Sequence, residues 1–217
     1  MIARMIARSR NVRALLEQVH PIAADATVLE VGSGAHGLVF YFGSRGVGID
    51  PLAVSYASLF PMWQREVPTV AGFGEHLPFA DRIFDVVLCD NVVDHAESPA
   101  QIVAELVRVL APGGLLYFTV NVHHPIYAVA SRFHAVWMGL GMPYEVRPFA
   151  DHTVHLTLRR ARALFANLPL RLVTESSQAG EAKSLVQRLQ AHGLIARFKA
   201  IFFKNALYQL IAVRTQA

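Results

Sequence analysis

The sequence has only one cysteine and no long apolar run. Cys89 cannot form a disulfide within the chain, and it ends the apolar run 84–89, which favours a buried strand thiol over a nucleophile. An unpaired thiol is typical of a reducing compartment, so we expect a cytoplasmic protein. No apolar stretch reaches the roughly 20 residues that a membrane-spanning helix needs, so we expect no membrane span.

Dense basic clusters and metal-ligand motifs are also scarce. The 217 residues have a net charge of +4 and a pI of about 9.5, but the basic residues are dispersed, apart from Arg159, Arg160 and Arg162. No basic stripe alternates with aromatics, so we expect no nucleic-acid partner. His152 and His155 lie three residues apart without a motif such as His-Glu-x-x-His, so we expect no metal site.

Apolar residues, in contrast, are plentiful and regularly spaced. They make up 53% of the chain, against 17% charged residues, which suits one domain over residues 1–217 with a buried core. The pattern predicts strands at 27–31, 46–50, 67–71, 84–89, 115–120, 170–174 and 207–213. It predicts helices after Pro51 and at 99–110, 157–167 and 181–192, with 111–114 ending the second of them.

This alternation predicts an α/β fold, a Rossmann-like and mostly parallel sheet with helices on both faces. Residues 1–26 are basic at their start and predict an N-terminal helical cap on that sheet. Residues 121–156 break the regular alternation after the fifth strand and contain several aromatics. Aromatic side chains suit a pocket wall, so we expect this insertion to form a lid on the substrate side.

A glycine-rich turn follows the first strand directly. It reads Gly32-x-Gly34-x-x-Gly37, which is typical of a loop that lets a nucleotide approach the backbone. Asp50 ends the second strand, where a carboxylate can accept both ribose hydroxyls. A tight turn with a purely structural role is the alternative.

The acidic residues near this turn bear on which nucleotide is bound. Glu30, Asp50, Glu75 and Asp90 are all expected at or near the carboxyl edge of the sheet. They would repel the pyrophosphate of a dinucleotide but attract the cationic groups of S-adenosylmethionine, and Glu30 is the candidate partner of its ammonium group. An NAD-dependent oxidoreductase is therefore the more distant alternative.

Three ordered motifs resemble those of a known family. Residues 28–34 (VLEVGSG), 75–79 (EHLPF) with 84–87 (FDVV), and 108–114 (RVLAPGG) are similar to the motifs of class I S-adenosylmethionine-dependent methyltransferases, type 11 branch. The resemblance spans residues 28–120. It implies S-adenosylmethionine as cofactor and a last strand that runs antiparallel to its neighbour.

The resemblance also implies a role for individual residues. Gly32, Ser33 and Gly34 would wrap the methionine part and Asp50 would hold the ribose. Pro51 and Leu77 would flank the adenine, while Asp90 would lie near the methionine end. With the residues taken from the loop and the acidic edge, the expected cofactor-binding set is Glu30, Gly32, Ser33, Gly34, Gly37, Asp50, Pro51, Glu75, Leu77 and Asp90.

The chain departs from the family pattern at two places. Phe73 stands where the family usually has an acid that contacts adenine, and the stretch 38–45 is short for a first helix. These departures favour the second function that we consider, a methyltransferase-like domain that binds a ligand or partner without catalysis. The retained acids and the glycine loop favour methyl transfer to a small-molecule acceptor.

An oxygen or nitrogen acceptor also needs a base, and histidine suits that task near neutral pH. The candidates are His95, which occupies the place of a frequent family histidine, and His123 and His124, which follow the fifth strand; His152 is a further one. A surface or hydrogen-bonded histidine is the alternative for each. The acceptor itself is not encoded in any motif.

Overall fold

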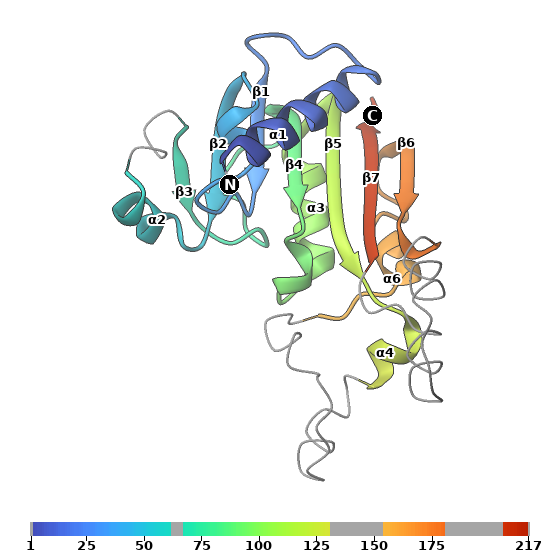
Figure 1. The fold of residues 1–217 in the computed structure, drawn as a ribbon. Coiled ribbons are helices and arrows are strands. Elements are labelled where there is room, and N and C mark those ends of the chain that lie inside the picture. Colours follow the sequence, from blue (N-terminus) through green and yellow to red (C-terminus); the bar gives the residue numbers. More distant parts are fainter. Residues whose placement is uncertain (1, 62–66, 131–153, 181–205, 217) are drawn as a thin grey trace.

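One seven-stranded sheet organises the chain (Figure 1). The computed structural model describes residues 2–61, 67–130, 154–180 and 206–216. Across the sheet the strand order is β3-β2-β1-β4-β5-β7-β6. The strands are β1 (Thr27–Val31), β2 (Arg45–Asp50), β3 (Thr69–Ala71), β4 (Phe84–Asp90), β5 (Leu110–Val122), β6 (Leu170–Ser177) and β7 (Ala206–Arg214).

The direction of the strands follows the sequence prediction. β3, β2, β1, β4 and β5 are parallel, whereas β7 runs antiparallel to both β5 and β6. The Rossmann-like, mostly parallel sheet and its antiparallel last strand are therefore confirmed. Parallel strands place their carboxyl ends at one edge, which is the lower edge in Figure 1.

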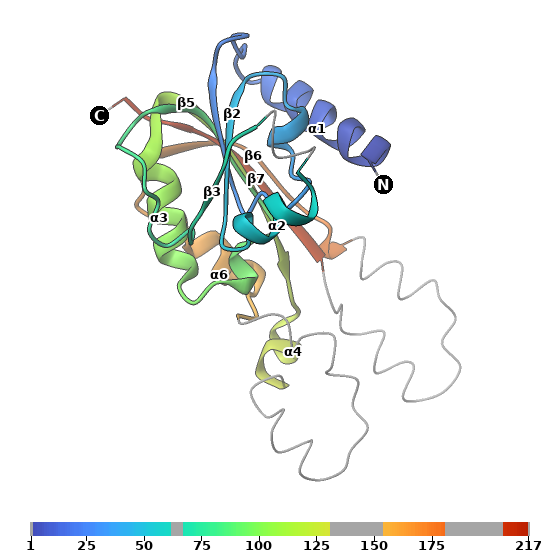
Figure 2. The same cartoon turned by 90° about the vertical axis from the view of Figure 1, so that its left-hand side faces the viewer.

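Helices cover both faces of the sheet, as Figure 2 shows edge-on. One face carries α1 (Ile2–Glu17), α2 (Ala53–Leu59) and the short 3-10 helix η1 (Val39–Tyr41). The other face carries α3 (Pro99–Val109) and α6 (Leu158–Ala163). Two short elements, η2 (Val93–His95) and α4 (Pro125–Ala130), follow the carboxyl ends of β4 and β5.

Alternating side chains along the strands divide the core into two apolar clusters. On the α3 side, Val87 and Cys89 of β4 pack with Leu106. On the α1 side, Val86 and Leu88 pack with the helix and with η1. A strand with both faces covered is apolar at successive positions, which explains the continuous apolar run at 86–89 in β4. Cys89 is a buried, free thiol.

The helix α1 packs on the η1 side of the sheet through polar and apolar contacts. Val12 and Leu16 are buried against the sheet. Ser9 Oγ donates to the Leu38 carbonyl at 2.7 Å, and the Arg13 guanidinium donates to the carbonyl of Phe42 at 2.7 Å. These bonds fix α1 against the segment that follows the glycine loop.

The structure differs from the prediction around residues 111–114. The helix α3 ends at Val109, close to the predicted end, but β5 begins immediately at Leu110 and contains the proline and both glycines. Gly113 has φ 78°, and the pairing of β5 with β4 shifts register between Phe84 and Val86. The glycines thus form an irregularity within the strand, and apolar spacing alone could not reveal it. The helix predicted at 181–192 lies outside the described residues.

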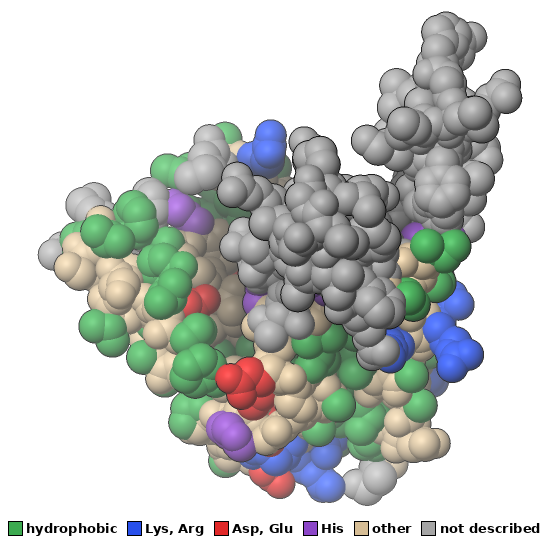
Figure 3. Space-filling model, turned by 90° about the horizontal axis from the view of Figure 1, so that it is seen from below, with side chains coloured by type: hydrophobic (Ala, Val, Ile, Leu, Met, Phe, Trp, Pro, Cys, Tyr) green, Lys and Arg blue, Asp and Glu red, His purple; other side chains and the backbone are tan. Residues whose placement is uncertain are grey.

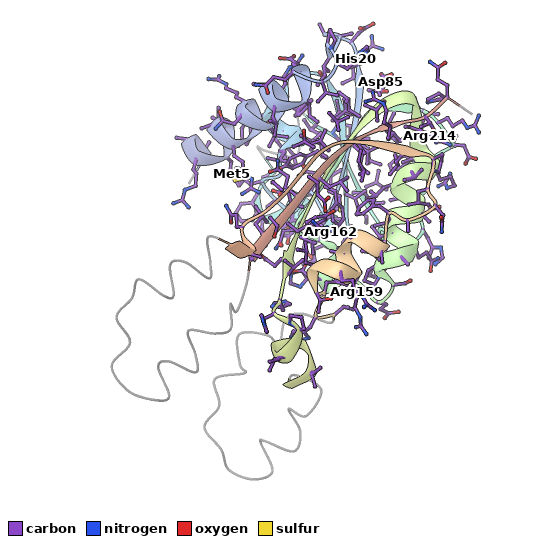
Figure 4. All side chains as sticks on the ribbon, turned by 90° about the vertical axis from the view of Figure 1, so that its right-hand side faces the viewer. Met5, His20, Asp85, Arg159, Arg162 and Arg214 are labelled. Atoms are coloured by element: carbon purple, nitrogen blue, oxygen red, sulfur yellow. The ribbon has the colours of Figure 1, made fainter. Side chains whose placement is uncertain are left out.

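The amino edge of the sheet is occupied by structural contacts. Buried Arg214 donates to the carbonyls of Val107, Arg108 and Leu110 at the end of α3, at 2.5, 3.0 and 2.5 Å. In Figure 4, Arg214 lies at the same end of the sheet as His20 and Asp85. The glycine-rich loop that follows β1 lies at the opposite, carboxyl edge. In the described part of the chain, no helix combines the length and apolarity needed to cross a membrane.

Candidate functional site

The glycine loop after β1 is bound to the end of β2. Gly32 and Gly34 have φ 72° and 55°, the left-handed region that side chains with a Cβ rarely adopt. The N–H groups of Gly32 and Ser33 both donate to the Ile49 carbonyl, at 2.8 and 3.2 Å. A Cβ on Gly34 would meet no atom within 4 Å, so the backbone is open to a ligand there.

The Asp50 carboxylate connects the glycine loop after β1 to the segment after β2. Its Oδ2 accepts the N–H of Gly34 at 2.9 Å, and its Oδ1 accepts the N–H of Leu52 at 2.8 Å. Each carboxylate oxygen has a second lone pair, so both can still accept a hydroxyl proton. Asp50 therefore orients the loop and remains suited to bind a pair of ribose hydroxyls.

Glu30 lies beneath the loop and is almost fully buried. Its Oε1 accepts the N–H of Leu38 at 3.0 Å and its Oε2 accepts that of Val39 at 2.8 Å. Burial, partly opposed by these two bonds, raises the pKa of Glu30 to about 8, so the carboxyl is mostly protonated at pH 7. In the structure both carboxyl oxygens support the loop and η1, and the expected attraction of the ammonium group stays a prediction.

Gly37 is required where the loop passes Glu30. A Cβ at Gly37 would collide with the Glu30 carboxylate and would lie 2.6 Å from the Ser33 carbonyl oxygen. The glycine thus permits the close approach of loop and carboxylate. Ser33 itself is buried and packs against Gly48 of β2.

Asp90 at the end of β4 has partners from two other elements. Its Oδ1 lies 2.7 Å from a guanidinium nitrogen of Arg8 on α1, and it accepts the Thr119 hydroxyl of β5 at 2.6 Å. Next along the chain, Asn91 has φ 59°, and its side-chain oxygen accepts the N–H of Asn121 at 3.0 Å. The ends of β4 and β5 are therefore locked together beside the glycine loop.

The residues expected near the adenine have different environments. Pro51 is exposed, but Leu77 is buried in the larger core cluster, which leaves it little surface for a ligand. Glu75 accepts the N–H groups of Glu97 and Ser98 at 3.1 and 3.4 Å, so its carboxylate supports the turn before α3.

Apolar side chains gather on the carboxyl edge over α2 and near β3. Four of them are more than half exposed: Leu52, Val54, Leu59 and Phe73. Figure 3 looks onto this edge and shows that apolar side chains gather on one side of it. Phe73, which stands where the family usually has an acid, is 65% exposed.

The three candidate histidines lie at the same edge but in different surroundings. His95 ends η2, is half-exposed, and has its Nε2 3.8 Å from buried Asp94. His123 is fully buried, with its ring centroid 5.2 Å from that of His155. His124 is half-buried, and its Nδ1 accepts the N–H of Ile126 at 3.3 Å. His152 lies outside the described residues.

Both described ends of the expected lid are attached to this edge. The N–H of His123 donates to the Leu156 carbonyl at 2.8 Å, and the N–H of Val154 donates to the Asp94 carbonyl at 3.0 Å. Residues 131–153, which hold most of the aromatics of that segment, lie outside the described part. The attachment brings both ends of residues 121–156 beside η2 and β5.

Arg8 and Thr119 are two site residues that sequence reasoning missed. Arg8 was visible only as one of several arginines near the start of the chain, and Thr119 as one residue of an apolar strand. Their contacts with Asp90 join positions 82 and 29 residues apart. Such tertiary contacts leave no spacing pattern in a sequence.

Comparison with known proteins agrees with this geometry. A family model described as "Methyltransferase domain" matches residues 29–118, from β1 to β5. An uncharacterized methyltransferase of Mycobacterium avium (strain 104) is 34% identical over 139 residues. That match covers 62% of this chain and 46% of the relative, so the chain spans about half the length of the relative.

Solved structures share the fold at low sequence identity. One of them is geranyl diphosphate C-methyltransferase from Streptomyces coelicolor A3(2), solved with Mg²⁺, geranyl diphosphate and S-adenosyl-L-homocysteine. Its TM-score is 0.66 at 17% sequence identity, and the match covers 95% of this chain and 77% of that one. Phosphoethanolamine N-methyltransferase 2 of Haemonchus contortus has a TM-score of 0.66 and 15% identity, covering 95% and 53%. The matched region, residues 29–118, holds the three ordered motifs and strands β1 to β5, so this part of the chain is similar to the methyltransferase domain of the type 11 family.

Proposed function

We propose that this protein is an enzyme that transfers the methyl group of S-adenosylmethionine to a small-molecule acceptor by in-line displacement. The observation that carries the proposal is the acidic edge around the glycine loop, where Asp50 and Asp90 bracket a backbone that is open at Gly34. This edge suits a nucleoside with cationic groups and disfavours an anionic pyrophosphate.

The described residues fit the parts of this cofactor. Asp50 retains lone pairs for the ribose, and the exposed apolar side chains of Pro51 and Phe73 offer surfaces for the adenine. Glu30 and Gly37 would act indirectly, by fixing the loop. When bound, S-adenosylmethionine supplies a methyl group already activated by its sulfonium.

The remaining task of the protein is alignment, because an activated methyl needs an acceptor held in line with it. For an oxygen or nitrogen acceptor, His95, His123 or His124 would take the proton at a ring nitrogen. The lid at 121–156 would exclude water and select the acceptor. Because two structural relatives are named for geranyl diphosphate and phosphoethanolamine, small molecules are the acceptor class that we favour.

Titration calorimetry with S-adenosylmethionine, S-adenosylhomocysteine and NAD tests the cofactor assignment. We expect micromolar binding of the two adenosyl ligands and none of NAD. Binding of NAD alone would overturn the assignment in favour of an oxidoreductase.

Methyl transfer is tested separately from binding, because a domain that binds without catalysis is the competing function. The enzyme is incubated with methyl-labelled S-adenosylmethionine and a small-molecule extract, and products are identified by mass spectrometry. Asp50→Ala serves as the control that lacks a cofactor contact. Cofactor binding without a labelled product from any extract would favour the non-catalytic function.

The buried free thiol of Cys89 is compatible with the cytoplasmic location that we also propose.

A further inference from the structure

The helix α4 projects from the carboxyl edge and exposes aliphatic side chains. Figures 1 and 2 both show α4 below the lower edge of the sheet, beyond the other labelled elements. Ile126 and Val129 are 53% and 56% exposed, and their spacing of three residues places them on one face of the helix. The sequence of α4, PIYAVA, contains no charged residue. Because a helix that faces water normally has a polar outer face, α4 is suited to an apolar partner.

Basic side chains lie on the neighbouring helix α6. This helix buries Ala161 against the core, whereas Arg159 and Arg160 are exposed. In Figure 4, Arg159 lies at the end of α6 nearer α4, and Arg162 lies farther from α4. Arg162 pairs with Glu175 of β6. Arg159 and Arg160 are therefore the cations of α6 that we consider for a partner.

One backbone contact joins the starts of the two helices. The N–H of His123 donates to the Leu156 carbonyl at 2.8 Å, and His123 also forms a β-bridge with Thr157. The helix α4 begins two residues after His123, and α6 begins one residue after Thr157. The aliphatic and basic side chains thus lie at one end of the molecule. Residues 121–130 and 154–163 hold three arginines and no acidic residue, so this end is positively charged.

We propose that the exposed faces of α4 and α6 dock the protein on an anionic membrane surface. Ile126 and Val129 enter the boundary between headgroups and acyl chains, and Arg159 and Arg160 donate hydrogen bonds to lipid phosphates. Such an interfacial contact combines aliphatic side chains with basic ones beside them, and it needs no helix that spans the membrane. The anionic lipids of a cytoplasmic leaflet provide the complementary charge.

The chemistry of this docking surface favours a bilayer over other partners. Two aliphatic side chains and two arginines are far fewer than the roughly 20 residues that each side of a stable protein interface contributes. A nucleic acid would bind the arginines through its phosphates but would leave the aliphatic side chains exposed. A bilayer of anionic lipids satisfies both kinds of side chain.

The docking surface lies at the same edge as the glycine loop and the candidate histidines. Docking would place the opening of the proposed active site beside the bilayer, and an apolar acceptor could enter from there. This consequence rests on the proposed function, whereas the docking itself does not.

Vesicle flotation tests the docking without cofactor or acceptor. Vesicles that contain phosphatidylglycerol are compared with vesicles of phosphatidylcholine alone, each at low and at high salt. We expect the protein to bind the anionic vesicles about tenfold more tightly at low salt. High salt should reduce this preference, because it screens the arginines.

Two double variants separate the aliphatic contribution from the basic one. Ile126→Ser with Val129→Ser should weaken binding to anionic vesicles about tenfold or more and keep its salt dependence. Arg159→Gln with Arg160→Gln should weaken it by a similar factor and remove most of the salt dependence. Thermal unfolding checks that both variants are folded.

Leu172→Ser and Arg171→Gln on β6 are the matched controls. Both side chains are exposed, and the register of β6 places them toward the amino edge, away from the docking surface. They should bind vesicles like the wild type. Equal losses in the controls and in the surface variants would overturn the proposal, and so would a wild type that does not float with anionic vesicles.

Light scattering examines a second copy of this chain as the occupant. A wild type that is a dimer, does not float, and becomes a monomer when Ile126 and Val129 are replaced would assign the surface to self-association and overturn the membrane proposal. Failure of flotation leaves the titration with S-adenosylmethionine unaffected, so failure of the docking is distinguishable from failure of the proposed function.

Discussion

The backbone N–H of Gly34 donates to the Asp50 carboxylate, with 2.9 Å between the nitrogen and Oδ2. One side chain at the end of β2 thus fixes the most open position of the loop that follows β1. The same carboxylate is the candidate ribose ligand. The conformation of the glycine loop and the proposed recognition of the ribose therefore depend on one side chain.

We expect Asp50→Ala to weaken S-adenosylmethionine binding by about 1.5–3 kcal/mol, the usual loss for a charged hydrogen bond. Asp50→Asn, which keeps one acceptor oxygen, should lose less. Calorimetry measures the dissociation constants, and thermal unfolding checks that the fold is intact. An unchanged dissociation constant for Asp50→Ala would remove Asp50 from the site.

Gly37 should tolerate no side chain. In Gly37→Ala the new methyl group would collide with the Glu30 carboxylate and the Ser33 carbonyl, and the rigid loop backbone can move only at a cost. We expect the free energy of unfolding to fall by about 1–3 kcal/mol. Gly180→Ala is the matched control, since a Cβ there meets no atom within 4 Å, and it should change stability by less than about 0.5 kcal/mol. Urea denaturation that cannot distinguish the two variants would refute this account of Gly37.

Glu30 should make stability depend on pH. Burial raises its pKa from 4.5 to about 8 in the folded protein. Between these values the folded protein binds more protons than the unfolded chain, so the free energy of unfolding falls as pH rises. The slope from this group is at most about 1.4 kcal/mol per pH unit.

Glu30→Gln resembles the protonated form and removes that contribution. The wild type should therefore lose stability relative to Glu30→Gln from pH 5 to pH 8 and change little relative to it above pH 9. Urea denaturation of both proteins across this range measures the difference. A difference that does not vary with pH would show that Glu30 is not protonated in the folded state.

The histidines after β5 should affect turnover without affecting cofactor affinity. If His123 or His124 acts as base, its replacement by alanine should lower the turnover number by about a hundredfold or more once an acceptor is known. His123→Ala should also lose some stability, because its ring is buried next to His155. His20→Ala, at the opposite edge of the sheet in Figure 4, is the control. Full turnover in the double variant would remove both histidines from the mechanism.

Much of the fold could be predicted because strand residues alternate with helical ones in the sequence. The run at 27–31 coincides with β1, and the predicted strands at 84–89 and 207–213 lie within β4 and β7. Burial on both faces makes such strands mostly apolar, and this signal is local. The course of 110–114 was not predictable, since a proline and two glycines are typical of a turn and their inclusion in β5 depends on pairing with β4.

The position of the candidate site was predictable from the sequence, but not which of its acids support the protein and which are available to a ligand. The acids at the strand ends could be located from the sequence because parallel strands end at one edge. Whether an acid faces a ligand or the protein depends on what packs against it. Glu30 is covered by η1, and Glu75 binds the turn before α3, whereas Asp90 is reached by Arg8. Each of these outcomes depends on a contact with another element.

The position of β7 constrains the order in which the sheet can assemble. It is synthesised after β6, yet it pairs with β5 on one side and with β6 on the other. While a ribosome is translating residues 123–205, the five parallel strands can already associate, but β5 presents an unsatisfied hydrogen-bonding edge. β6 has no neighbour to join until β7 emerges. The nascent chain thus passes through a stage with an open apolar strand edge, the kind of surface that favours aggregation and chaperone binding.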